Sequence, residues 1–140
     1  MIRANHSATH LLHEALRDAA DVVTCHCPLT DETRGMIGTD FLAGMKRGAI
    51  VVNTARGGIV DEEALAGAIR SGSIAGAGID VTATEPAPAD STIMALAELP
   101  NVILTPHVAW ASTGAMQTLV DQLIDNVEAF VAGREANRVV

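Results

Sequence analysis

Four side chains that could carry chemistry lie just after short apolar runs of the sequence: Arg56, Asp80, Glu85 and His107. The guanidinium of an arginine can hold a carboxylate through two parallel hydrogen bonds. The imidazole of a histidine can accept or donate the proton of a hydroxyl or carbonyl oxygen near neutral pH, and a neighbouring glutamate can orient it. These residue types together suit a small 2-oxo or 2-hydroxy acid that undergoes hydride transfer.

Each of these residues also has an ordinary interpretation. Arg56 could cap a helix or pair with Asp61, and Glu85 could be a solvated loop acid. His107 could be structural, and Asp80 could accept hydrogen bonds from backbone N–H groups in a turn. The functional interpretation therefore requires that all four residues lie at one edge of the fold.

Short apolar runs alternate with helical patterns along the chain. The predicted strands are 21–26, 49–53, 74–81 and 101–105, and the predicted helices lie within 5–19, 39–45, 61–72, 93–99 and 112–132. We expect Asp61 to cap the third helix and Gly72 to end it in a left-handed conformation. Glycines 76 and 78 are expected to let a helix pack closely on the sheet.

The strands are apolar on both faces, which is typical of a parallel sheet covered by helices. We therefore predict an α/β fold, a Rossmann-like half domain of about four parallel strands with flanking helices. Ligands of such sheets bind at the carboxyl ends of the strands. In this sequence those ends are 26–28, 53–58, 80 and 105–107, so the four chemical side chains are expected to meet there.

Composition limits the possible partners. The 140 residues are 49% hydrophobic with a formal net charge of −8, so we expect one domain over 1–140 and no nucleic-acid partner. No apolar run approaches the roughly 20 residues of a membrane helix, so no membrane partner is expected. Cys25 and Cys27 are too close together to staple the fold, which favours a reducing, cytoplasmic location.

Four stretches carry a family resemblance: ADVVTCHCPLTDETRGMIG, MKRGAIVVNTARGGIVDEEAL, SGSIAGAGIDV followed by TEP, and NVILTPHVAWAS. From about residue 20 to 140 the chain resembles the C-terminal half of the D-isomer-specific 2-hydroxyacid dehydrogenases. The last stretch and GGIVDEEAL are most similar to the glycerate dehydrogenase (hydroxypyruvate reductase) branch. The resemblance implies an NAD- or NADP-dependent oxidoreductase that acts on a small 2-oxo or 2-hydroxy acid.

The resemblance also implies roles for individual residues. Arg56 would bind the substrate carboxylate, His107 would be the general acid/base, and Glu85 would pair with His107. The residues implied to line the cofactor are Cys27 and Pro28 at the adenine end, Thr54 and Ala55 at the nicotinamide ribose, Asp80 at the nicotinamide carboxamide, and Arg56, His107 and Ala109, the last standing where many relatives have glycine.

The sequence departs from the family in one large respect. It contains no G-x-G-x-x-G fingerprint, the loop that cradles the pyrophosphate, because Gly76 and Gly78 lack the third glycine and fall within a later strand. The acid that distinguishes NAD from NADP belongs to the same missing part. We therefore expect weak or no turnover by this chain alone, and a non-catalytic chimeric or engineered folding module is the alternative.

Residues 3–17 are similar to the start of the alanyl-tRNA synthetase editing region, where an H-x-x-x-H pair supplies zinc ligands. His6 and His10 match that pair, and Cys25 and Cys27 follow on the next strand, so a zinc-binding remnant is a further alternative. We favour a structural helix without metal, since the second ligand pair of that family is absent. Residues 1–19 could then have a different origin from the rest of the chain.

The missing part of the fold has a consequence for assembly. Strand 22–26 would lie at an apolar sheet edge with unpaired N–H and C=O groups, and such edges tend to pair with another chain. We predict a homo-oligomer through this edge. The apolar stripe of the last helix, residues 112–132, is expected to pack across such an assembly.

Overall fold

The computed structural model describes residues 17–138. These residues form two compact units, one ending at His107 and the other beginning at Val108, and each unit is described by itself. Most of the predicted first helix, with His6 and His10, lies outside the described residues. The predictions of a zinc ligand pair and of a separate origin for that segment stay predictions.

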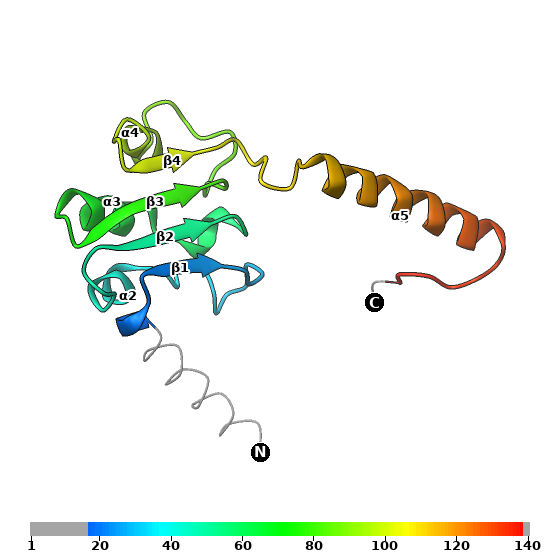
Figure 1. The fold of residues 1–140 in the computed structure, drawn as a ribbon, viewed down its shortest axis with the longest axis horizontal. Coiled ribbons are helices and arrows are strands. Elements are labelled where there is room, and N and C mark those ends of the chain that lie inside the picture. The colour runs from blue at the N-terminus through cyan, green and yellow to red at the C-terminus, as the bar shows by residue number, and fades with distance from the viewer. Residues whose placement is uncertain (1–16, 139–140) are drawn as a thin grey trace, which may run out of the picture. The chain divides into compact units, whose positions relative to one another are not determined.

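The first unit is built on a four-stranded parallel sheet, so the predicted fold class is confirmed. The strands are β1 (Val22–Cys25), β2 (Ala49–Asn53), β3 (Ile74–Ile79) and β4 (Val102–Leu104), and they lie in the order β1-β2-β3-β4. All four arrows point to the same edge of the sheet (Figure 1). The predicted strands were right in place, although β3 ends two residues earlier than expected.

Three short helices and one 3-10 turn connect the strands: α2 (Thr39–Ala43), η1 (Gly57–Ile59), α3 (Glu62–Arg70) and α4 (Thr92–Leu96). Strands that follow one another in the sequence are also neighbours in the sheet. Right-handed crossovers between such parallel strands put every connecting helix on the same face of the sheet. The side chains of Val51, Ala77 and Ile79 point to that face and are almost completely buried. The core of the unit therefore lies between one sheet face and the helices.

Within residues 17–107, the described part of the first unit, no helix covers the opposite face of the sheet. Val22, Ile50 and Ile103 point to it and are 52%, 40% and 69% exposed. The expectation that Gly76 admits a helix was wrong: a Cβ there would lie 2.3 Å from the carbonyl oxygen of Asn101, so the glycine admits the backbone that leads into β4.

Helix α3 begins and ends as the sequence predicts. The Asp61 carboxylate accepts hydrogen bonds from the N–H groups of Glu63 and Ala64, each at 3.0 Å. Gly72 has a φ of 74°, the left-handed conformation expected after a helix. Leu65 has no exposed surface, so the first turn of α3 is packed against the core.

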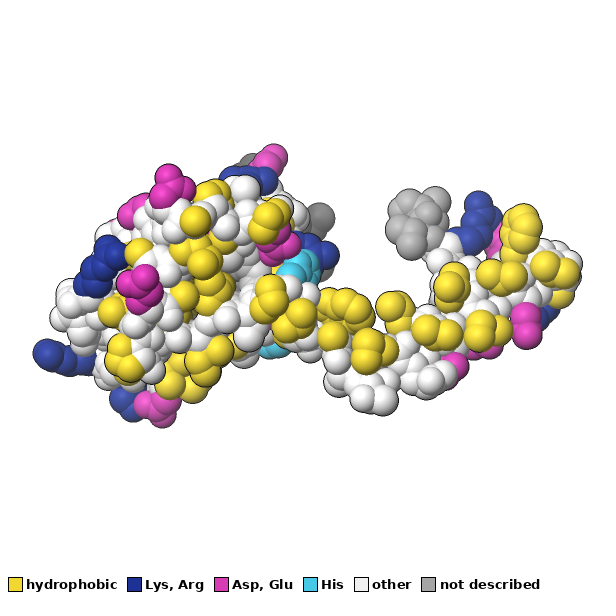
Figure 2. All heavy atoms as spheres, turned by 90° about the horizontal axis from the view of Figure 1, so that it is seen from above, with side chains coloured by type: hydrophobic (Ala, Val, Ile, Leu, Met, Phe, Trp, Pro, Cys, Tyr) yellow, Lys and Arg dark blue, Asp and Glu magenta, His cyan; other side chains and the backbone are white. Residues whose placement is uncertain are grey.

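The second unit is dominated by α5 (Thr113–Val131), whose first turn is capped by the Ser112 hydroxyl through the Ala115 N–H at 3.2 Å. Hydrophobic side chains follow one another along this helix (Figure 2). They are Met116, Leu119, Val120, Leu123, Ile124, Val127 and Phe130. In the described part of the chain, no helix is both long enough and apolar enough to cross a membrane.

Candidate functional site

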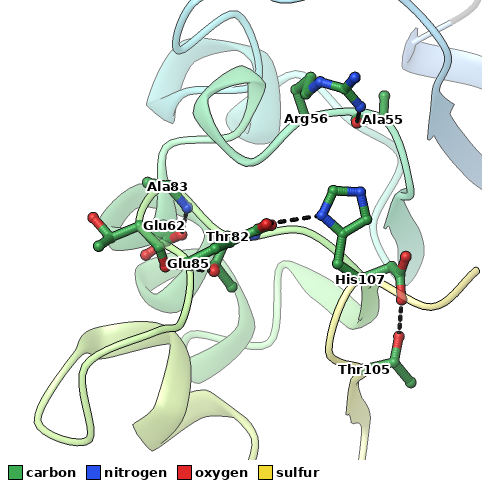
Figure 3. A network of polar contacts seen from close by, with 10 residues as sticks. Ala55, Arg56, Glu62, Thr82, Ala83, Glu85, Thr105 and His107 are labelled. Carbon is green, nitrogen blue, oxygen red and sulfur yellow. Dashed lines mark hydrogen bonds and ion pairs between the residues drawn. The ribbon is translucent and has the colours of Figure 1, made fainter.

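The centre of the site is a contact between a histidine and a glutamate at the carboxyl edge of the sheet. Nδ1 of His107, which follows β4, lies 2.8 Å from Oε2 of Glu85, which follows β3 (Figure 3). The hydrogen bond with His107, followed by the one with the Thr82 N–H, lowers the pKa of the Glu85 carboxyl. An ionised carboxylate can only accept hydrogen bonds, so Nδ1 of His107 carries the hydrogen of this contact.

A tight turn after β3 holds the other oxygen of Glu85. Oε1 accepts a hydrogen bond from the Thr82 N–H at 3.1 Å, and the Thr82 hydroxyl donates to the Thr84 carbonyl at 2.8 Å. Both oxygens of Glu85 thus have a partner, one in its own turn and one on His107. These two contacts fix the direction of the Glu85 carboxylate, although the Glu85 side chain is about 40% exposed.

His107 itself has an unusual backbone. Its φ of 57° falls in the left-handed region, which costs a non-glycine residue on the order of 1 kcal/mol or more. The His107 N–H donates to the Asp80 carbonyl at 2.8 Å, and this contact holds the strained conformation. Strain of this kind is concentrated at functional sites, which supports the functional interpretation of His107 over the structural one.

Asp80 is one of two buried polar residues of the described chain and is only 4% exposed. Its Oδ1 accepts a hydrogen bond from the Thr105 hydroxyl at 2.5 Å. Thr105 directly follows β4, so this contact joins the ends of two neighbouring strands. Asp80 is therefore a buried acceptor placed beside the Glu85–His107 pair.

Arg56 stands on a turn organised by Asn53, the last residue of β2. The Asn53 side chain is fully buried; its Nδ2 donates to the Arg56 carbonyl at 2.9 Å and its Oδ1 accepts from the Ala55 N–H at 3.1 Å. Arg56 Nη1 donates to the Ala55 carbonyl at 2.7 Å, while Asp61 caps α3, so the pairing of Arg56 with Asp61 is not formed. The Arg56 charge acts on Glu85 as a smaller cause of its lowered pKa.

A pocket of about 630 Å³ opens beside the Glu85–His107 pair, and Arg56 is not among the residues that line it. Asp80, Glu85 and His107 form its polar side, and Met94 of α4 and Leu104 of β4 contribute to its apolar wall. Small-molecule sites commonly combine such an apolar wall with a few convergent polar groups. The pocket can take a compact ligand with one polar end.

The remaining predicted cofactor residues are spread more widely. Thr54 is exposed and Ala55 half-buried on the Asn53 turn, whereas Cys27 lines a separate pocket of about 560 Å³ beside β1. Pro28 follows Cys27, and its carbonyl accepts from the Thr33 hydroxyl at 2.7 Å. Ala109 belongs to the second unit. Within residues 17–138, no group of three His, Cys, Asp or Glu side chains could hold a metal ion.

Sequence reasoning missed the residues that hold the chemical groups in place. Asn53 fixes the Arg56 turn, Thr105 meets Asp80, and Glu62 of α3 accepts a hydrogen bond from the Ala83 N–H at 2.8 Å. A polar residue at the end of an apolar strand was the available signal for Asn53. Nothing local in the sequence indicates the contact of Glu62, which lies 21 residues from Ala83.

Comparison with known proteins fits this geometry. Residues 3–109 match the NAD binding domain of the D-isomer specific 2-hydroxyacid dehydrogenases. A glycerate dehydrogenase of Methylorubrum extorquens is 59% identical over 126 residues, 90% of this chain but 40% of that protein. The NAD-complexed D-isomer specific 2-hydroxyacid dehydrogenase of Lactobacillus delbrueckii ssp. bulgaricus matches with a TM-score of 0.83 at 33% identity, over 91% of this chain and 42% of that one.

An acyclic imino acid reductase in complex with NADPH and D-Arg has the same fold, with a TM-score of 0.80 at 31% identity, over 91% of this chain and 40% of that one. The chain thus spans about 40% of the length of the relatives that it matches. The family match begins at residue 3 and so includes the segment with His6 and His10. The chain belongs to the D-isomer specific 2-hydroxyacid dehydrogenase family, as its NAD-binding domain.

Proposed function

We propose that this chain carries the carboxylate-binding and proton-transfer residues of an NAD(P)-dependent 2-hydroxyacid dehydrogenase. The observation that supports this most is the contact of 2.8 Å between His107 Nδ1 and Glu85 Oε2 at the carboxyl edge of the sheet. In the sheet order, Arg56 follows β2 and His107 follows β4, and Asp80 directly follows β3, the strand between them. The glycerate dehydrogenase relative favours a small substrate such as glycerate or hydroxypyruvate.

Each residue has a defined task in this proposal. Arg56 holds the substrate carboxylate through its guanidinium fork. His107 gives a proton from Nε2 to the carbonyl oxygen during reduction and takes it back during oxidation, and the Glu85 carboxylate stabilises the charged imidazole at Nδ1. A nicotinamide cofactor, when bound, supplies the hydride that reduces substrate C2 or accepts it in the reverse direction.

The chemistry of the described residues fits one end of such a cofactor. Asp80 is a buried carboxylate acceptor, and Met94 and Leu104 give an apolar wall beside it, as a planar ring that carries an amide requires. A pyrophosphate group needs several backbone N–H groups at a glycine-rich turn before a helix. The sequence shows no G-x-G-x-x-G for that role, so the residues present account for the nicotinamide end only.

Calorimetric titration of the 140-residue chain with NADH and NADPH tests the proposal. We expect binding that the Asp80→Ala substitution abolishes, with Asp90→Ala, an exposed loop acid, as the matched control. Binding of hydroxypyruvate or glyoxylate, added with the cofactor, should depend on Arg56. The Arg56→Lys variant should bind these acids only weakly, because lysine lacks the planar fork. Absence of both cofactor and oxo-acid binding up to millimolar concentration contradicts the proposed function.

We also propose that the chain forms homo-oligomers through β1. This strand is at the edge of the sheet order, and its residues Val22 and Thr24 are exposed. A lysine on such an edge discourages pairing with another chain. Val22→Lys is therefore expected to shift sedimentation equilibrium toward monomer, while Ile103→Lys on the other edge strand leaves it unchanged; a monomeric unsubstituted chain at tens of micromolar contradicts the pairing.

A further inference from the structure

The turn that presents Glu85 is attached to helix α3 through one carboxylate. Glu62, the first residue of α3, accepts a hydrogen bond at Oε1 from the Ala83 N–H at 2.8 Å (Figure 3). Ala83 is the neighbour of Thr82, whose N–H donates to Glu85 at 3.1 Å. The contacts thus run without interruption from α3 to Ala83, from Thr82 to Glu85, and from Glu85 to His107.

Helix α3 is a firm base for this attachment. Its residues Leu65, Ala66 and Ile69 are at most 6% exposed, and Asp61 caps its first turn through two backbone N–H groups. A carboxylate in the first turn of a helix is also stabilised by the N–H groups there. Glu62 therefore links Ala83 to a helix that is packed against the core.

The same turn is held from a second side by backbone contact. A Cβ at Gly57 would lie 2.0 Å from the carbonyl carbon and oxygen of Thr82, so only glycine permits the Arg56 turn to lie against this segment. Thr82 is thus packed on the Arg56 turn while Ala83 is bonded to α3. Removal of the Glu62 carboxylate would release one of the two restraints and leave the other.

We propose that Glu62 is a positioning residue for the Glu85–His107 pair. It acts through the Ala83 N–H; no hydrogen bond joins it to Glu85 or His107, and it does not line the pocket beside them. This inference rests on the proposed function only for its catalytic meaning; the structural coupling itself can be measured in a chain without any ligand.

Charge and hydrogen bonding predict opposite effects at Glu62, which makes the coupling testable. Loss of the negative charge of Glu62 can by itself only lower the pKa of Glu85, because the charged carboxylate would meet less repulsion. Loss of positioning would raise that pKa, because the contacts with His107 and the Thr82 N–H that hold it down would loosen. Glu62→Gln removes the charge and keeps an acceptor oxygen, whereas Glu62→Ala removes both.

The experiment is a ¹³C NMR titration of the Glu85 carboxyl in the 140-residue chain and its variants. Glu62→Ala is expected to shift the Glu85 midpoint upward, and the Ala83 amide to exchange roughly five- to tenfold faster, as loss of one hydrogen bond implies. Glu62→Gln should leave the midpoint in place or lower it. Glu63→Ala, a substitution one residue along that removes the contact with the Thr92 hydroxyl, is the control for general damage to α3 and should cause no upward shift.

The outcomes separate the inference from the proposed function. Equal midpoints for Glu62→Ala and Glu62→Gln, or an upward shift of the same size in Glu63→Ala, would overturn the positioning role. An upward shift specific to Glu62→Ala supports it even in a chain that binds no cofactor or oxo acid, in which case only the proposed function fails.

Discussion

Replacement of Asn53 is expected to destabilise the first unit and the Arg56 turn together. Asn53→Ala leaves the Ala55 N–H without its acceptor and takes one of two donors from the Arg56 carbonyl, which keeps the Ile59 N–H at 3.2 Å. A buried group left unsatisfied costs about 1–3 kcal/mol, and a lost hydrogen bond about 1 kcal/mol. Since Ala55 is only half-buried, we take the lower end and expect a loss of about 2 kcal/mol in the free energy of unfolding.

Asn53→Asp is the sharper variant because its effect depends on pH. The introduced carboxyl can accept from the Ala55 N–H, but it can donate to the Arg56 carbonyl only when protonated. Burial and this carbonyl raise its pKa in the folded state above the unfolded value. The variant should therefore match the original chain best at low pH and lose stability as the pH rises through the unfolded and then the folded pKa.

Urea unfolding of the 140-residue chain, followed by circular dichroism across the acidic and neutral range, measures both variants. Thr54→Ala, at an exposed position of the same turn, is the matched control and is expected to change little. A loss below about 0.5 kcal/mol in Asn53→Ala, or an Asn53→Asp variant whose stability relative to the original chain does not fall with rising pH, would refute the role assigned to Asn53.

Three further predictions concern a helix cap, a carboxylate and a thiol. Asp61→Ala should lower the free energy of unfolding by about 1 kcal/mol in urea titrations, whereas Asp61→Asn, which keeps an acceptor for the same N–H groups, should cost a few tenths. The pKa of the Glu85 carboxyl lies below its ordinary value of 4.5. Its contribution to stability is therefore complete above pH 4.5 and is lost as the pH falls through the pKa of the folded state. Glu85→Gln should flatten this part of a plot of urea midpoint against pH. Burial, and secondarily Cys27, raises the pKa of the Cys25 thiol to about 11. Iodoacetamide at about pH 8 should therefore label the half-exposed Cys27 first, as detected by mass spectrometry. Equal labelling of the two cysteines would contradict the burial of Cys25.

The sequence was sufficient to place the candidate catalytic residues because parallel strands impose a direction. Once the apolar runs were identified as neighbouring parallel strands, Asp80 and His107 had to lie at the same edge. The roles of Asp61 as the cap of α3 and of Gly72 as its left-handed end could also be predicted, because both depend on local backbone geometry. These inferences needed no knowledge of distant contacts.

The contacts that orient the site could not be predicted in the same way. The pairing of Glu85 with His107, 22 residues apart, was implied only by the family resemblance, and the contact of Thr105 with Asp80, 25 residues apart, was missed. Such partners are set by the exact path of the loops, which hydrophobic periodicity does not describe. Gly76 shows the same limit, because a glycine in a strand signals close approach but not whether a helix or the Asn101 backbone approaches.

The placement of polar groups distinguishes an organised site from residues that are only present. A carboxylate and an imidazole on mobile loops would meet in many geometries, and catalytic groups need to be held to within a fraction of an ångström. Here Glu85 is held by its own turn, His107 by the Asp80 carbonyl, and Arg56 by the buried Asn53. All of these contacts lie within residues 53–107, inside one compact unit. The Glu85–His107 pair is therefore formed by the strands and loops of that unit itself, and its geometry and titration can be measured before any turnover is sought.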